Sequence, residues 1–451
     1  MTQLDEAIAR YHKLLEADYL TDLSWASELQ AKMKEQHLTI GGRPISPVLR
    51  PHFVSNRQYA NLVKAAEALY SAIDRIEKLA LTNPAYMARM RMLPAEKMLA
   101  SLNPGYSYMA VTSLLDTNLN NGSLHFSGYT ADTPMGVIYG EALNNLFYDS
   151  EPVKAFRRKY KLSKMSGAKP FLQSLLKAYK EFGGKKKPQI AILEFRQPFQ
   201  TSDSDEYFLI MELFRQEGFK VQIVSPDQLE YRDGVLRKGD FTIDLVYRRV
   251  KVSEFLVRFD LTHPLVRAYR DRTVCVVNSF RSELAQKRAI FDLLTDSNIT
   301  ASFPANERKA IREFIPWTRV VGANKTTYAE KTIDLPEFIL SHRDKLVLRP
   351  NDDSGDLDTF QGANLDSSGW ERAMKIASRG AYVVQEVLAP VKAMFPLHRY
   401  GGVEMQEMQI DVQPHSFLGR VNGCSTWLRP AVESKFSTIT GLAPTFILEG
   451  K

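Results

Sequence analysis

The sequence is poor in two features that define large classes of protein. It has only two cysteines in 451 residues, Cys275 and Cys424, which excludes a disulfide scaffold and a cysteine zinc cluster. No apolar run approaches the ~20 residues that a membrane helix needs. Acidic residues interrupt the first twenty positions, so a signal peptide is not expected. We therefore expect a protein of the reducing cytoplasm that has no membrane partner.

Glycine and net charge are also low. Glycine accounts for 24 of 451 residues, below the ~7% average, although enzymes that hold phosphates often use glycine-rich loops. The net charge is +7, from 59 Lys and Arg against 52 Asp and Glu. The basic stretches 154–161 and 185–187 are typical of solvated helix faces and ends. A nucleic-acid partner is therefore not expected, since that function usually needs a clustered basic face.

Several signatures of common enzyme classes are missing. The chain has no P-loop, no dinucleotide-binding fingerprint, no His-Glu-x-x-His and no Gly-x-Ser-x-Gly. Its eight histidines are scattered, and none forms the i, i+4 pair that is typical of helical zinc sites. Any catalytic site must therefore be assembled from residues that are far apart in the sequence.

Hydrophobic patterning predicts an α/β protein of several parts. Helical spacing dominates the first hundred residues, including 59–81, and short strands flank the Asn-Asn-Gly turn at 120–122. From residue 189, strand and helix alternate as in a parallel βαβ sheet. The expected parts are a helical N-terminal segment, a first core part, a βαβ domain and a mixed C-terminal part, with boundaries at 1–105, 106–185, 186–300 and 301–451.

Seven segments, taken in order, carry a family resemblance. They are Asp116, Ala131–Pro134, Leu245–Arg249, Asn278–Leu294, Leu346–Pro350, Tyr382–Glu386 and Phe417–Ile447. In this order they resemble the glutathionylspermidine synthetase-type, circularly permuted ATP-grasp proteins. The resemblance spans roughly residues 20–450 but is weak at each single point.

The resemblance implies both a fold and an activity. The fold would be ATP-grasp-like α/β with a preceding parallel βαβ sheet and a helical N-terminal segment. The activity would be ATP-dependent carboxylate–amine (C–N) ligation through an acyl phosphate, with a peptide-like acid and an amine as substrates. ATP and Mg²⁺ would be the cofactors. Such a site needs oxygen ligands for Mg²⁺ and cations that neutralise the transferred phosphoryl group.

The resemblance also assigns the cations. Arg349 stands where the family has a lysine before proline, and it keeps the charge while allowing bidentate phosphate contacts. Arg429 ends a strand in the well-matched C-terminal segment, and the two arginines are the expected catalytic cations. Lys287 and Arg288 share the place of a lysine on the nucleotide side; either one can fill that role, and the alternative interpretation is that both are solvated. For Arg349, a surface arginine at the end of a strand remains the alternative interpretation.

The expected metal ligands are incomplete. The resemblance assigns Mg²⁺ to Asp116, with the nearby Asp132 as a substitute ligand. The family's glutamate and asparagine ligands align with Gly128 and Thr130, which offer no side-chain oxygen and a neutral hydroxyl. Asp116 would otherwise be an aspartate that caps a turn.

The expected nucleotide contacts lie in the C-terminal part. The backbone of Gln385, Glu386 and Val387 would hold adenine, and Gly355 would contribute to a phosphate-closing loop. That loop is unusual, because residues 351–362 contain four aspartates and two glycines. Either the aspartates recruit a metal, or the loop is a solvated surface loop in a chain that has lost catalysis. The second hypothesis is therefore a catalytically degenerate ATP-grasp homologue that serves as a nucleotide- or peptide-binding or interaction module.

Overall fold

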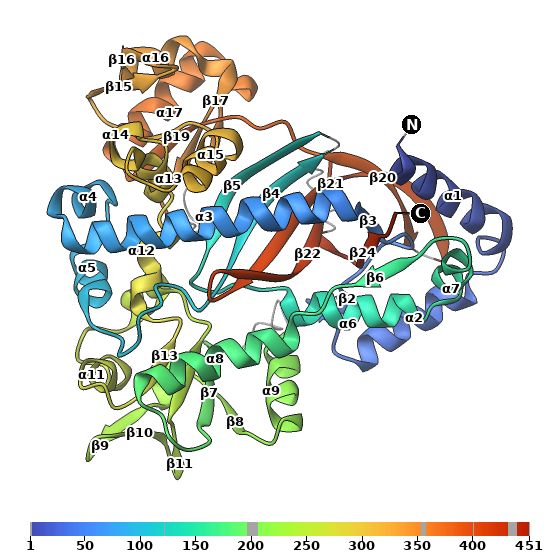
Figure 1. The fold of residues 1–451 in the computed structure, drawn as a ribbon, viewed down its shortest axis with the longest axis horizontal. Helices are drawn as coiled ribbons and strands as arrows, with labels where there is room; N and C mark the ends of the chain where they lie inside the picture. The colour runs from blue at the N-terminus through green and yellow to red at the C-terminus, as the bar shows by residue number, and fades with distance from the viewer. Residues whose placement is uncertain are drawn as a thin grey trace.

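The computed structural model describes residues 2–120, 122–195, 206–352, 358–399, 401–431 and 440–450. A long antiparallel sheet and the helix α3 (Asn56–Thr82) occupy the middle of the molecule (Figure 1). One lobe lies above and one below the C-terminal half of α3, and the helices α1 and α2 lie at the opposite side. No described helix has both the length and the apolar character needed to cross a membrane.

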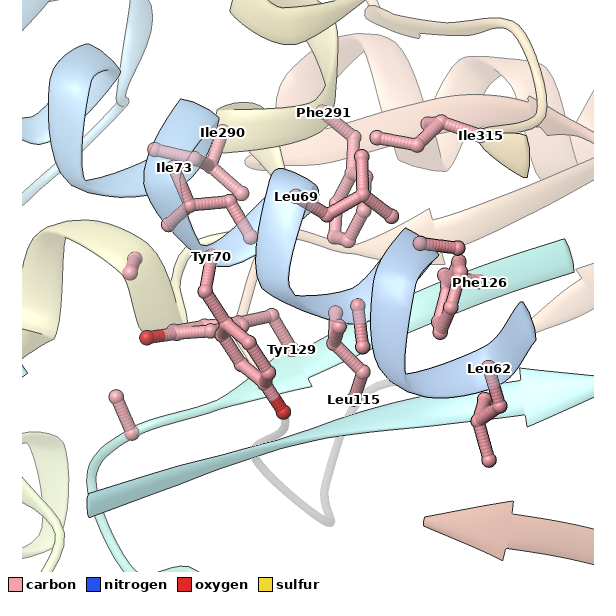
Figure 2. Close-up of a cluster of buried hydrophobic side chains, with 14 of the residues drawn as sticks. Leu62, Leu69, Tyr70, Ile73, Leu115, Phe126, Tyr129, Ile290, Phe291 and Ile315 are labelled. Carbon is pink, nitrogen blue, oxygen red and sulfur yellow. The ribbon is translucent and has the colours of Figure 1, made fainter. Parts of the chain in front are cut away.

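The N-terminal segment is helical, as its spacing predicts. Helix α3 begins at a capping box in which Ser55 and Gln58 satisfy each other's backbone N–H groups. It buries Leu62, Leu69 and Ile73 against the central sheet (Figure 2). The other elements of this segment are α1 (Gln3–Asp18), α2 (Ser24–Glu35), β1 (Thr39–Ile40), β2 (Arg43–Pro44), β3 (His52–Ser55), α4 (Pro84–Arg89) and α5 (Pro94–Ser101).

The central sheet has the strand order β23-β22-β21-β4-β5, and β20 pairs with the far end of β21. The hairpin between β4 and β5 forms at the turn that the sequence predicts, and its register places Asp116 opposite Gly128. The C-terminal part of the chain supplies the other strands. The bounds are β4 (Thr112–Asn120), β5 (Ser123–Thr130), β20 (Lys392–Arg399), β21 (Gly402–Phe417), β22 (Arg420–Pro430) and β23 (Gly441–Ala443).

Further helices and a small three-stranded sheet lie on the side of the central sheet that faces away from α3 and at its right-hand end in Figure 1. Strand β24 (Thr445–Leu448) lies between β3 and β6 and pairs parallel to β3. The remaining elements here are α6 (Val137–Tyr148), α7 (Glu151–Arg157), β6 (Leu162–Lys164) and α8 (Ala168–Phe182).

The lower-left lobe in Figure 1 is built on the parallel sheet that the βαβ pattern predicts. Its strand order is β13-β12-β7-β8, and all three pairings are parallel. The lobe's elements are β7 (Gln189–Leu193), α9 (Glu206–Gln216), β8 (Lys220–Val224), η1 (Pro226–Gln228), β9 (Glu230–Arg232), β10 (Val235–Lys238), β11 (Phe241–Thr242), β12 (Leu245–Arg248), α10 (Val252–Arg258), α11 (Pro264–Arg270) and β13 (Cys275–Val277).

The upper-left lobe contains a four-stranded antiparallel sheet of order β14-β19-β17-β18. Helices α16 and α17 pack on it. The lobe's elements are α14 (Ser297–Thr300), α15 (Ala305–Phe314), β14 (Thr318–Val320), β15 (Lys325–Tyr328), β16 (Lys331–Asp334), α16 (Leu335–Ser341), η3 (Arg343–Lys345), β17 (Leu346–Pro350), β18 (Phe360–Gln361), η4 (Gly362–Asn364), α17 (Ser367–Arg379) and β19 (Tyr382–Glu386).

No single helix runs through the Asn278–Leu294 segment. The chain forms η2 (Phe280–Ser282), α12 (Glu283–Gln286) and α13 (Ala289–Leu294), and Lys287 between the last two has an extended backbone. Asn351 accounts for the break, because its backbone and side-chain oxygens accept hydrogen bonds from the N–H groups of Arg288 and Ala289. A segment distant in sequence therefore caps α13, which local periodicity does not reveal.

Candidate active site

Three polar side chains share one face of the central sheet, the face opposite α3. Val412 of β21 pairs with Thr117 of β4. Successive residues of a strand alternate between the two faces of a sheet. Asp116, Asp411 and Gln413 therefore all lie on the face opposite the one that carries Val412 and Thr117, away from α3. Gln413 donates a hydrogen bond from Nε2 to Oδ1 of Asp116 at 2.8 Å.

The electrostatic surroundings of Asp116 define the site. Burial raises the pKa of this carboxyl, and the neighbouring Asp411 carboxylate raises it further. The hydrogen bond from Gln413 and the charges of Arg288 and Arg349 lower the same pKa. Asp116 therefore lies within electrostatic reach of a second carboxylate and of two arginines that come from another part of the chain.

Arg429 joins the same site through Asp411. Its guanidinium forms an ion pair with Oδ2 of Asp411, and 53% of its side chain is exposed. The two residues lie on the neighbouring strands β22 and β21, two positions apart in register. Arg429 thus keeps surface that is available to a further anion while it compensates one of the two carboxylates.

Arg288 and Arg349 are held together by the interruption between α12 and α13. Arg288 donates from Nη1 to the carbonyl oxygen of Pro350 at 2.9 Å, and its backbone N–H donates to Asn351. Arg349 is the residue before Pro350 on β17. The break in the helix therefore positions Arg288 beside the end of the strand that carries Arg349.

Lys287 points to a different environment. Its side chain is fully buried, and Nζ forms ion pairs with Glu96 at 2.8 Å, Glu283 at 2.8 Å and Asp352 at 2.6 Å. These carboxylates raise the pKa of the lysine, while burial lowers it. Of the two cations that share the expected nucleotide position, Arg288 acts on Asp116 through its charge, whereas Lys287 is enclosed by three carboxylates. We call this group the Lys287 cluster.

Asp132 is part of a buried ion pair. Its Oδ1 pairs with Arg248 and its Oδ2 accepts the N–H of Val252 at 3.0 Å, and the side chains of both charged residues are nearly fully buried. Both carboxylate oxygens are therefore already bonded to protein groups. This arrangement joins the end of β5 to β12 and α10, and it accounts for the Ala131–Pro134 segment without a metal ion.

The beginning of α6 is also filled by the protein itself. The buried Glu206 accepts hydrogen bonds from the backbone N–H groups of Gly136, Ile138 and Tyr139 at 2.9 to 3.4 Å. Arg249 lies 3.7 Å from the same carboxylate. The N-terminal N–H groups that could attract an anion are thus bonded to an internal glutamate.

The expected adenine segment lies in the middle of the upper-left sheet. The N–H of Glu386 donates to the carbonyl of Trp317, and the N–H of Val387 donates to that of Lys345. The Gln385 side chain is buried and donates to Thr318 at 2.9 Å. These backbone N–H groups already have acceptors, so a purine on this strand would need other donors.

Gly128 has a packing role that explains its missing side chain. A Cβ atom at this position would lie 2.2 Å from Oδ2 of Asp116. The Asp116 carboxylate therefore fills the space of a side chain at 128. Thr130 lies opposite Leu114 at the end of the same hairpin, and Gly355 lies outside the described residues.

Asp411 and Gln413 are the site residues that sequence reasoning missed. The alternation of polar and apolar residues over 409–413 is a signal that was present, because it predicts a strand with one polar face. The partner face, and therefore the meeting with Asp116, depends on the pairing of β21 with a strand almost 300 residues earlier. Asp352, one of the loop aspartates considered as a metal ligand, forms an ion pair with Lys287.

The donor set suits a divalent cation. The Asp116 carboxyl, whose pKa the neighbouring Asp411 carboxylate helps to raise, and the adjacent Gln413 carboxamide supply the kind of oxygen ligands that Mg²⁺ prefers. A cation between Asp116 and Asp411 would relieve their repulsion. Among the described residues, the only trio of acidic side chains close enough to share a metal is the Lys287 cluster, where the lysine ammonium already supplies the positive charge.

No family model and no curated protein matches the sequence. Solved structures do match. A glutathione synthetase-like effector from Globodera pallida, in its apo form, aligns over 94% of this chain and 98% of its own, with a TM-score of 0.60 and 13% identity. A putative γ-glutamylcysteine synthetase from Methylobacillus flagellatus aligns over 88% and 87% with a TM-score of 0.42 and 11% identity. The alignment with the effector shows that the chain has a mixed α/β, ATP-grasp-like fold with a helical N-terminal segment.

Proposed function

We propose that this protein is an ATP-dependent ligase that activates a carboxylate for attack by an amine. The observation that carries the proposal is the convergence of Arg288, Arg349 and Arg429 on the carboxylates of Asp116 and Asp411. Arginines beside acidic oxygen ligands are the groups that hold a polyphosphate together with its Mg²⁺.

The proposed roles follow from the placement of each group. Asp116 and Asp411 would hold the divalent cation, which supplies charge neutralisation on the phosphates. Arg288 and Arg349 would bind the phosphates from the upper-left lobe, and Arg429 would face the γ-phosphoryl group from the central sheet. A substrate carboxylate oxygen would attack the γ-phosphorus and displace ADP. The amine would then attack the acyl carbon, form the C–N bond and displace inorganic phosphate.

A second candidate function is a nucleotide-binding module without catalysis. It is favoured by the Lys287 cluster, since a lysine bonded to three carboxylates carries no surplus charge for a nucleotide. It is also favoured by Gly128, which contributes no metal ligand. Both functions need the same arginines, so they differ in metal dependence and in turnover.

Thermal unfolding with ATP tests the shared part of the proposal. We expect ATP with Mg²⁺ to raise Tm, because ligands of the native state stabilise it, and we expect ATP alone to raise it much less. Arg349→Met should remove most of the shift, whereas the exposed control Arg372→Met should keep it. A shift that is equal with and without divalent ions supports the binding module, and no shift with any ion contradicts both functions.

Hydroxylamine trapping tests the ligase reaction itself. With ATP, Mg²⁺ and a panel of carboxylic acids, hydroxylamine replaces the unknown amine, and an acyl phosphate is converted to a hydroxamate that is measured by its ferric complex. We expect Asp116→Asn and Asp411→Asn each to reduce this product by about 100-fold or more, since a metal ion supplies several kcal/mol of charge stabilisation. ATP binding without hydroxamate for any acid would favour the module.

A further inference from the structure

A cavity lies between α3 and the face of the central sheet that is opposite to the candidate active site. Its volume is about 910 Å³, within the usual range for small-molecule sites. Leu115 pairs with Tyr129, and Ser113 pairs with Ser416. Because side chains alternate along a strand, these residues face α3, away from Asp116. The cavity is therefore separate from the candidate active site, and a role for it does not require the proposed ligase activity.

Two buried polar side chains that line this cavity each have an oxygen without a hydrogen-bond partner among the described residues. Glu77 of α3 is 1% exposed, and the oxygen is its Oε1. Ser416 of β21 is also 1% exposed, and the oxygen is that of its hydroxyl. A buried polar group without a partner costs about 1–3 kcal/mol. Because this cost is not offset within the protein, the position of Glu77 on the apolar face of α3 points to a ligand that its carboxyl group binds.

Tyrosine rings form the walls around these groups. Tyr70 lies two helical turns before Glu77, and its ring meets that of Tyr129 edge to face, with centroids 5.9 Å apart. Figure 2 shows this pair, one ring from α3 and one from β5, at one end of the hydrophobic cluster. Tyr59 and Tyr108 also line the cavity. The faces of aromatic rings attract cations, and do so more strongly in desolvated sites.

Two of the three lysine and arginine side chains that line the cavity are paired with carboxylates. Lys78 pairs with Asp74 at 2.6 Å, and Arg420 pairs with Glu67 at 2.8 Å. These two pairs add no net charge to the rim. The third cation, Lys64, is exposed to solvent. The deepest ionisable group is an acid, and the walls are aromatic, so the interior favours a positive ligand over a negative one.

We propose that this cavity binds an organic ammonium ion, which donates N–H hydrogen bonds to Glu77 and Ser416 and lies against the tyrosine rings. Burial raises the pKa of Glu77 well above its usual range, and Asp74 raises it further, while Lys78 lowers it. The empty cavity therefore favours the protonated form of this carboxyl more than water does. A bound ammonium ion favours the ionised form, so binding shifts Glu77 toward ionisation, and the proton that it loses passes to solvent. The titratable or charged groups around it are Asp74, Lys78, Tyr129, Lys64, Glu67 and Arg420.

Calorimetric titration with n-butylammonium chloride tests the proposal. Sodium butyrate and n-butanol serve as the anionic and neutral probes of the same size. We expect saturable binding of the ammonium probe only, accompanied by proton release, which is measured from the heats in two buffers of different ionisation enthalpy. Glu77→Gln should weaken binding by about tenfold or more and abolish proton release, and Ser416→Ala should weaken it several-fold.

The variants also control for folding and for location. Glu77→Gln keeps the size and shape of the buried side chain and removes its ionisable group, so it should unfold at a Tm close to that of the parent. The exposed Glu16→Gln is the matched control and should bind normally. The proposal is overturned if the ammonium probe does not bind, if butyrate binds instead, if Glu77→Gln binds with unchanged affinity, or if Asp116→Asn abolishes binding while Glu77→Gln does not.

Discussion

At the scale of single residues, the contact between Gly128 and Asp116 explains why this site tolerates the loss of a side chain. The two residues lie opposite each other in the β4–β5 hairpin, and the carboxylate occupies the space above the glycine. The backbone of Gly128 is not in the left-handed region, so an L-residue is excluded there by contact and not by conformation. Replacing Gly128 by glutamate would therefore displace Asp116 and would not simply add a ligand.

Gly128→Ala tests this contact. The new Cβ would lie 2.2 Å from Oδ2 of Asp116, so we expect the carboxylate to move and the metal-dependent part of the ATP-induced Tm shift to fall by half or more. Gly402→Ala is the control, because a Cβ there would have a nearest neighbour at 3.8 Å. An unchanged metal-dependent shift in a folded Gly128→Ala protein would mean that Asp116 does not hold the cation.

At the scale of secondary-structure elements, the Lys287 cluster joins parts of the chain that are far apart. It ties α5, α12 and the segment after β17 to a single ammonium group, next to the break between α12 and α13. A buried ion pair contributes little net stability, but removing one partner leaves an uncompensated charge. The cluster therefore places Lys287 in the structural framework that supports Arg288 and Arg349.

Lys287→Met should destabilise the protein by about 3–5 kcal/mol, because it leaves three carboxylates without their counter-charge. The measurement is urea unfolding followed by circular dichroism. The exposed Lys32→Met, which breaks a surface pair with Glu28, should change stability little. If Lys287→Met keeps its stability and instead abolishes ATP binding, Lys287 is a nucleotide ligand, contrary to its placement here.

The same cluster predicts a dependence of stability on pH. Burial, together with the charges of Asp132 and Glu96, outweighs the lowering effect of Lys287 and raises the pKa of Glu283 from 4.5 to about 8. The folded state then retains a proton that the unfolded chain releases, so this group makes the free energy of unfolding fall as pH rises from about 5 to 8. In Glu283→Gln that decline should be smaller. A steeper decline in the variant would contradict the assignment.

At the scale of the whole molecule, the candidate active site depends on how two distant parts of the chain pack together. The central sheet supplies Asp116, Asp411 and Arg429, and the upper-left lobe with its neighbouring helix break supplies Arg288 and Arg349. A ligand held between them would couple the two parts.

Hydrogen exchange measures that coupling. We expect ATP with Mg²⁺ to slow amide exchange both in β4, over 112–120, and around β17, over 346–350, because the ligand would contact both sides of the site. The strands β9–β11 at the far edge of the lower-left lobe should exchange at unchanged rates and serve as the internal control. Protection of one side only would show that the nucleotide does not lie between them.

Sequence and tertiary structure contributed differently to these conclusions. Periodicity alone determined the helical N-terminal segment, the β4–β5 hairpin and the parallel βαβ sheet, because these patterns depend on neighbours close in sequence. Only the tertiary structure decided that Lys287 and Arg288, adjacent in sequence, face different groups, and that Asp411 meets Asp116. Those outcomes depend on the break imposed by Asn351 and on the pairing of strands almost 300 residues apart. Buried charges are assigned by such long-range contacts, and a local pattern does not contain them.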